Sequence, residues 1–184
     1  MHEEIIIAGF GGQGVLFAGQ VLAHAALMEE RNVTWIPSYG PEMRGGTAHC
    51  TVIVSDEEIG SPLVRHPSAA LVLNPPSMEK YAALVKPGGV LVLDSTLIAQ
   101  RARRDDIREL QVPARALATE IGMPQAANMV LLGALAQSTG VVQLETLEKL
   151  LAERFGEGSE KFEANRRALH AGAERVGSEK NQAR

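Results

Sequence analysis

The sequence is poor in cysteine, in aromatic residues and in positive charge, and each shortage excludes a class of protein. A single cysteine, Cys50, excludes an internal disulfide framework, a multi-cysteine zinc site and an iron–sulfur cluster held by this chain alone. Aromatic residues make up 4% of the chain, too few for platforms on which bases or sugars stack. The formal net charge of −4 argues against a nucleic-acid-binding surface, which would be basic.

Long hydrophobic runs are also missing, since none approaches the roughly 18 residues that a membrane-spanning helix needs. The first residues, Met-His-Glu-Glu, lack the positive start of a secretory signal, so we expect a cytoplasmic protein. The remaining composition is that of a packed core, with 45% hydrophobic and 22% charged residues among 184. A chain of this length fits one domain that buries its core without disulfides.

Short β-branched runs alternate with longer helical stripes along the chain. The strands are expected at 5–8, 33–36, 48–54, 69–73 and 90–93, and the main helices at 14–29, 78–85, 128–137 and in two stripes after residue 143. We expect Pro37 to end the second strand, and Ser77 and Asn128 to cap the helices that follow them. The alternation predicts a single-domain α/β fold: an open, largely parallel, Rossmann-like sheet with helices on both faces and a helical C-terminal portion.

A glycine-rich turn, Gly9–Gly14, follows the first strand and precedes the first helix. Its Gly-x-Gly-x-x-Gly pattern lets the chain turn sharply and brings backbone N–H groups to a helix N-terminus, which favours an anion. A dinucleotide-binding fold also needs an acid at the end of the second strand. Here Glu29 and Glu30 come too early for that role. The turn therefore favours contact with an anion or with backbone over a complete nicotinamide or flavin site, and tight strand–helix packing is the alternative.

A second cluster of glycines spans Ser38–Thr47. The pair Gly45-Gly46 permits unusual backbone dihedrals, and such a run can present N–H donors to a carboxylate or phosphate. Arg44 would add a planar fork for the same group or for an acid on another chain. A solvated loop is the alternative.

Three other features have a functional and a plainer interpretation. Cys50 is either a redox thiol or a small buried hydrophobic residue, and the second interpretation is favoured because free cysteine is usually buried. Asp94 and Ser95 follow a strand, where they either line a cleft or cap a helix. The charged run 101–106 is either a solvated surface or a contact for an acidic partner.

Together the two glycine clusters resemble a known family. Residues 7–15, Ile-Ala-Gly-Phe-Gly-Gly-Gln-Gly-Val, and residues 39–47, Tyr-Gly-Pro-Glu-Met-Arg-Gly-Gly-Thr, are similar to the gamma subunit of 2-oxoacid:ferredoxin oxidoreductases. These thiamine-diphosphate-dependent enzymes convert a 2-oxoacid, coenzyme A and oxidised ferredoxin into acyl-CoA, CO2 and reduced ferredoxin. The resemblance implies that residues 1–177 form the gamma-type catalytic domain and residues 178–184 a polar C-terminal tail.

The form of the second cluster is most similar to the 2-oxoglutarate type, with pyruvate, branched-chain 2-oxoacids or indolepyruvate as alternative substrates. The resemblance implies a chain that is inactive alone, with no catalytic residue, cofactor or metal of its own. Alpha, beta and ferredoxin-like delta-type subunits would hold thiamine diphosphate, Mg²⁺ and the iron–sulfur clusters, and ferredoxin would accept the electrons. No nucleic acid or membrane is expected as a partner.

The resemblance also implies which residues act. This chain would help form the coenzyme A cleft and the subunit interface. The ligand-binding or interface residues that the resemblance implies are Gly11, Gly12, Gln13, Gly14, Glu42, Arg44, Gly45, Gly46 and Thr47. Two alternatives stay open, a free-standing dinucleotide-binding oxidoreductase and a purely structural assembly subunit.

Overall fold

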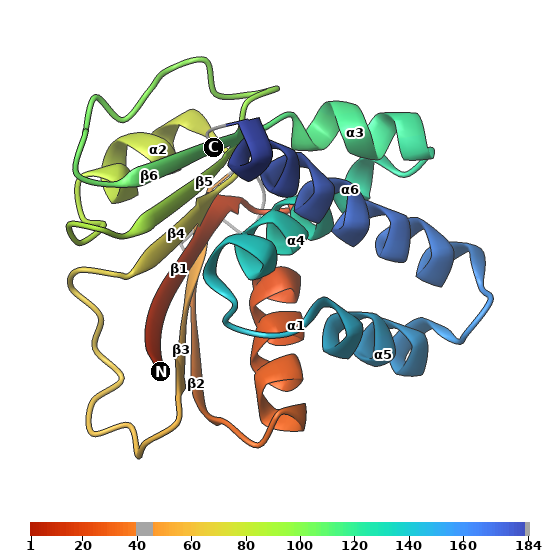
Figure 1. Cartoon of the computed structure of the whole chain (residues 1–184), viewed down its shortest axis with the longest axis horizontal. Helices are drawn as coiled ribbons and strands as arrows, with labels where there is room; N and C mark the ends of the chain where they lie inside the picture. The colour runs from red at the N-terminus through yellow and green to blue at the C-terminus, as the bar shows by residue number, and fades with distance from the viewer. Residues whose placement is uncertain (40–45, 183–184) are drawn as a thin grey trace.

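The computed structural model describes residues 1–39 and 46–182 of the chain. Six strands form one sheet in the order β2-β3-β1-β4-β5-β6 (Figure 1). β1, β4, β5 and β6 run parallel, and β3 runs antiparallel to both β1 and β2. The strands are β1 His2–Phe10, β2 Asn32–Tyr39, β3 Thr47–Ser55, β4 Ala69–Val72, β5 Val90–Asp94 and β6 Arg108–Val112.

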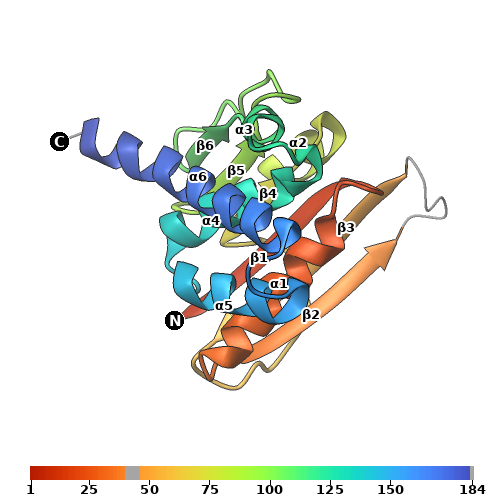
Figure 2. The same cartoon turned by 90° about the vertical axis from the view of Figure 1, so that its right-hand side faces the viewer.

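Helices cover both faces of this sheet. α2 lies on one face, and α1 and α3–α6 lie together on the other (Figure 1). The helices are α1 Val15–Met28, α2 Pro75–Ala82, α3 Ala114–Ile121, the short 3-10 helix η1 Pro124–Ala126, α4 Ala127–Thr139, α5 Leu144–Phe155 and α6 Glu160–Gln182. The predicted α/β fold, with its largely parallel sheet and helical C-terminal portion, is confirmed. Figure 2 shows the C-terminal end of α6 extending beyond the sheet.

The first strand explains why both faces need helices. Ile5 and Ile7 belong to the hydrophobic cluster under α1 and α4, whereas Ile6 and Ala8 belong to the cluster under α2. Successive side chains of a strand point to opposite faces, so a continuous apolar run must be covered twice. Because β1 lies between β3 and β4, the carboxyl end of β1 and the turn after it lie near the middle of the sheet edge.

Two predicted boundaries are wrong for identifiable reasons. β2 continues past Pro37 to Tyr39, because β2 is an edge strand in which alternate N–H groups have no partner strand and a proline is tolerated. α2 begins before Ser77, because Asn74 is its N-cap and its side chain accepts a hydrogen bond from the Ser77 N–H at 2.8 Å. The two prolines at the start of α2 fit positions whose N–H groups have no helical partner.

α4 is buried on all sides, and its tightest contact is with α6. A Cβ atom on Gly133 of α4 would overlap the carbonyl oxygen of Leu169, and one on Gly172 of α6 would overlap the carbonyl oxygen of Val130. The two backbones therefore touch directly at this crossing. The contact holds α6 against α4, and α4 also contacts the glycine-rich turn through Asn128.

This crossing predicts a large effect of one methyl group. Gly133→Ala should lower the free energy of unfolding by roughly 3 kcal/mol, since the added carbon overpacks backbone that has no room to move. Urea unfolding monitored by circular dichroism measures this change in the free energy of unfolding. Gly177→Ala, on α6 with open space around its Cβ position, is the control and should raise stability by up to about 1 kcal/mol. Equal effects of both variants would contradict the packing.

Candidate functional site

The glycine-rich turn connects β1 to α1, and its glycines have different reasons to be there. Gly12 and Gly14 have φ of 95° and 73°, a left-handed region that favours glycine. Gly9 makes room for the side chain of Gln13, whose Oε1 would lie 2.7 Å from a Cβ at that position. Gln13 Oε1 accepts a hydrogen bond from the Phe10 N–H at 2.6 Å, and its Nε2 donates to the Leu73 carbonyl at 3.0 Å. The Gln13 amide thus ties the turn to the end of β4.

Asn128 of α4 occupies the space beside the last glycine of the turn. Its Nδ2 donates to the Gly14 carbonyl at 3.0 Å, and a Cβ on Gly14 would overlap the same Nδ2 atom. The prediction that Asn128 caps its own helix is wrong, because Ala126 holds the N-cap position without a side-chain hydrogen bond. Asn128 is buried and crosses to the turn instead. The chain's own amide therefore fills this side of the turn.

The structure brings the two glycine clusters together. The Gly11 N–H donates to the Gly46 carbonyl at 2.9 Å, and Thr47 pairs with Phe10 where β3 begins beside the end of β1. The second glycine of the pattern is the one whose backbone would approach a dinucleotide pyrophosphate, and its N–H already has a protein partner. Of the other predicted site residues, Glu42, Arg44 and Gly45 lie outside the described residues.

Two adjoining cavities open where the turn is not filled, and Gly12 and Gln125 line both. Apart from its chain neighbours, no heavy atom of the described residues lies within 4 Å of a Cβ placed on Gly12. The smaller cavity, about 210 Å³, is lined by Gln13, Leu73, Asp94, Leu97, Arg115, Pro124 and Ala127. The larger, about 500 Å³, is lined by Gly14, Phe17, Met123, Ala126, Asn128, Phe155, Lys161 and Asn165. We call the two cavities together the Gly12 cleft.

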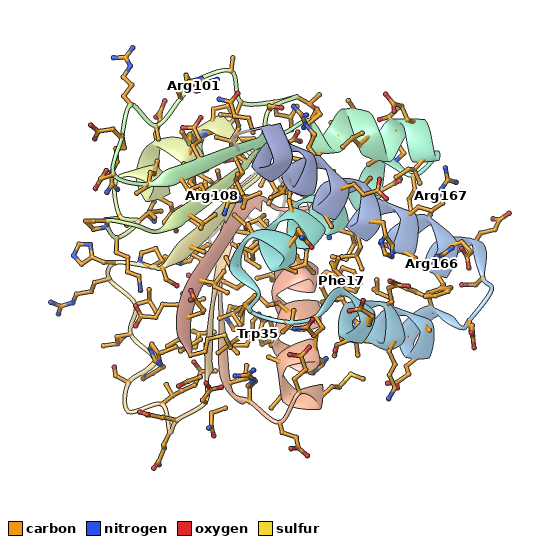
Figure 3. The ribbon with its side chains drawn as sticks, in the orientation of Figure 1. Phe17, Trp35, Arg101, Arg108, Arg166 and Arg167 are labelled. Carbon is orange, nitrogen blue, oxygen red and sulfur yellow. The ribbon has the colours of Figure 1, made fainter. Side chains whose placement is uncertain are left out.

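The Gly12 cleft has an apolar wall and a positive end. The rings of Phe17 and Phe155 lie with their centroids 5.9 Å apart, and Figure 3 shows Phe17 on α1 facing α5. Among the described residues no side chain caps the start of α1, and its first turn holds no acid. The positive end of the helix dipole and Lys161 therefore both favour an anion here.

Asp94 contributes to the cleft and to the fold at once. Its Oδ1 accepts hydrogen bonds from the backbone N–H groups of Thr96 at 3.1 Å and Arg115 at 3.3 Å, so it also anchors the first turn of α3. The side chain is buried and lines the smaller cavity. Asp94 therefore lines a cleft and also hydrogen-bonds the first turn of a helix, which are the two kinds of role that the sequence suggested for it.

Cys50 and its neighbour His49 lie on β3, beside the turn. Cys50 is fully buried, and this burial raises the pKa of its thiol to about 12, an effect that the Trp35 indole opposes only in part. The interpretation of Cys50 as a small buried hydrophobic residue is confirmed. His49 packs against the Tyr81 ring of α2, and its pKa lies below the ordinary value because of burial and the nearby Lys80 charge.

A protonated and buried thiol should not react. At pH 8 we expect an alkylating reagent to modify less than about a tenth of the native chains in an hour, since the thiolate is the reactive form. The same reagent should modify the chain completely in guanidinium, and thiol counting by mass spectrometry distinguishes the two. Rapid labelling of the native chain would show that Cys50 is accessible after all.

Several walls of the Gly12 cleft carry no signal in the sequence. Asn128 and Gly14 are separated by 114 positions, and Gln125, Phe155 and Lys161 come from three different helical elements. Among the side chains of residues 1–39 and 46–177, no three His, Cys, Asp or Glu gather as a metal site would require. No helix in the same ranges is both long and apolar enough to cross a membrane.

The sheet order, the glycine-rich turn and the cleft beside it define an α/β domain of the Rossmann-like class whose glycine-rich turn is partly closed by its own amides. Residues 4–175 match the family described as Pyruvate ferredoxin/flavodoxin oxidoreductase, and the chain belongs to that family. The resemblance predicted from the two glycine clusters is thereby confirmed.

Individual relatives support the same family. The chain is 38% identical to 2-oxoglutarate synthase subunit KorC of Methanothermobacter marburgensis over 183 residues, 96% of this chain and 97% of that one. It is 41% identical to ketoisovalerate oxidoreductase subunit VorA of the same organism over 173 residues, 93% of this chain but 36% of VorA. The chain thus spans about a third of the VorA length.

A solved structure agrees in fold. The crystal structure of the keto/oxoacid ferredoxin oxidoreductase gamma subunit from Geobacter sulfurreducens matches with a TM-score of 0.85 at 33% identity, covering 97% of this chain and 98% of that one.

Proposed function

We propose that this chain is the gamma subunit of a thiamine-diphosphate-dependent 2-oxoacid:ferredoxin oxidoreductase and that the 2-oxoacid is 2-oxoglutarate. The observation that carries the proposal is the match to KorC, which extends over nearly the whole of both chains. The match to VorA covers a third of a longer protein and keeps branched-chain 2-oxoacids as the second candidate substrates. The complex would work in the cytoplasm with ferredoxin as acceptor.

The role proposed for this chain is to form one wall of the coenzyme A cleft. Coenzyme A carries phosphates, an adenine ring and a long, weakly polar arm. The uncapped start of α1 and Lys161 suit a phosphate, and the apolar wall of Phe17 and Phe155 suits a ring or the arm. Glu42 and Arg44 are included in this proposal because the family resemblance implies that they bind the ligand or a partner subunit.

Cofactors of the complex do not fit this chain's described residues. Cluster ligation needs several thiolates, and the single thiol, Cys50, is buried and protonated near neutral pH. The Gly11 N–H, which would approach a dinucleotide pyrophosphate, already donates to the Gly46 carbonyl. From the family resemblance we assign thiamine diphosphate, Mg²⁺ and the clusters to alpha, beta and delta-type partner subunits, with acyl-CoA formed on the assembled complex.

The proposal is tested on the natively purified complex. Chains that bind thiamine diphosphate and iron–sulfur clusters should copurify with this one, and a low-potential dye should be reduced with coenzyme A and 2-oxoglutarate at least about tenfold faster than with pyruvate or a branched-chain 2-oxoacid. This chain alone should be inactive. Purification without companions, or turnover by the isolated chain, would contradict the proposal.

Removing one positive charge from the Gly12 cleft tests whether coenzyme A binds there. Lys161→Ala should raise the KM for coenzyme A by about tenfold, because one charge-assisted contact with a phosphate is lost, and leave the KM for the 2-oxoacid unchanged. Lys149→Ala, an exposed lysine on α5 outside the cleft, is the matched control. An unchanged KM for coenzyme A in the Lys161 variant would indicate that coenzyme A binds elsewhere, and it would favour a purely structural role for this subunit.

A further inference from the structure

A second groove lies on the opposite face of the sheet, between α2 and the connection from β5 to β6. Its volume is about 600 Å³. The less exposed part of its lining is apolar, with Met78, Ala82 and Ala102, and the edge is formed by the exposed Ala83 and by Glu79, Gln100, Arg101, Arg103 and Arg104. We call it the α2 groove. It shares no lining residue with the Gly12 cleft.

The connection that forms one wall of the α2 groove is firmly held. Ile98 and Ile107 are buried in the cluster under α2, at either end of the connection. Between them the Ala102 N–H donates to Glu109 Oε2 at 2.7 Å. Arg104 Nη1 donates to the carbonyls of Ala82 at 3.0 Å and Val85 at 2.6 Å, at the carboxyl end of α2. The groove is therefore preformed.

The arginines on this wall have different partners. Arg104 forms an ion pair with Asp106 as well as its bonds to α2, so its charge is already balanced. Arg101 and Arg103 alternate along the chain with Ala102 and Arg104, which are held by hydrogen bonds. Both arginines are exposed, and neither has an ion pair within the part of the chain that the structure describes. Figure 3 shows Arg101 on the opposite side of the molecule from Arg166 and Arg167.

Arg103 is also backbone-strained. Its φ is 51°, a left-handed conformation that is unfavourable for most residues and that glycine or asparagine adopts more readily. With Glu79 as the one acid on the edge, the groove has an excess of positive charge on a chain whose net charge is −4.

We propose that the α2 groove docks an acidic amphipathic segment of a partner subunit. The apolar lining would receive one or two apolar side chains, and Arg101 and Arg103 would bind carboxylates beside them, since the guanidinium fork matches a carboxylate. A free anion would leave the apolar lining exposed, which is why a protein segment fits better. This inference rests on the proposed function, because it requires that the chain works in a complex.

Charge reversal in the assembled complex tests the docking. The double variant Arg101→Glu and Arg103→Glu should weaken association of this chain with its copurifying subunits by at least about tenfold, and the remaining affinity should depend less on salt. The control is Arg65→Glu with Arg167→Glu, the same change of charge at exposed positions outside the groove. Equal affinities of the two double variants would overturn the proposal.

Arg103→Gly separates docking from folding. It removes the guanidinium but relieves the left-handed strain, so the variant should unfold at an equal or higher temperature and still bind its partners more weakly. Glu30→Gly, at the other non-glycine position with positive φ in the described ranges, relieves similar strain outside the groove. That control should leave association unchanged. A variant of Arg103 with wild-type affinity would overturn the proposal.

Cross-linking identifies the occupant. Ala83→Cys places a reactive thiol on the exposed edge of the groove, and Cys50 does not interfere because it is buried. A maleimide photo-cross-linker on this thiol, in the complex, should capture a partner peptide with at least two Asp or Glu residues; no cross-link, or a peptide without acids, would overturn the proposal. If the wild-type chain formed no complex at all, that result would contradict both the proposed function and the proposed docking of a partner segment.

Discussion

The turn after the first strand is closed by the protein's own amides, and the arrangement of the rest of the site depends on this. Gln13 connects it to the end of β4, Asn128 connects it to α4, and the Gly11 N–H is bonded to the Gly46 carbonyl. A buried backbone group must find a partner, and in a dinucleotide-binding fold the ligand supplies some of those partners. Here protein groups supply them, and among the described residues the side of the turn at Gly12 is left open.

The C-terminal helices also take part in the site. α4, which contacts the turn through Asn128, packs against α6 with backbone against backbone at Gly133 and Gly172. The same packing places Lys161, at the start of α6, on the wall of the Gly12 cleft. The two proposed contact regions lie on opposite faces of the sheet: the Gly12 cleft on the α1 face, and the α2 groove on the other. The proposed ligand wall and the proposed docking surface therefore share no lining residue.

The sequence predicts the parts of this structure whose signal is local. Runs such as 5–8 and 90–93 are recognisable because strands buried on both faces are continuously apolar, and the turn is recognisable because positive φ demands glycine. Pro37 misleads because its tolerance depends on β2 being an edge strand, which neighbouring residues do not reveal. Asn128 misleads because a short polar residue near a helix start resembles a cap, while its partner lies 114 positions away. The walls of the cleft depend on tertiary packing in the same way.

Because protein groups close the glycine-rich turn, we expect this chain to have no dinucleotide site of its own. Isothermal titration of the purified chain with NAD, NADP and FAD measures this directly. The closed turn predicts no heat of binding for any of the three at concentrations up to about 1 mM, which corresponds to a binding free energy weaker than about 4 kcal/mol. A saturable titration with micromolar affinity for one of them would contradict the account and favour a free-standing oxidoreductase.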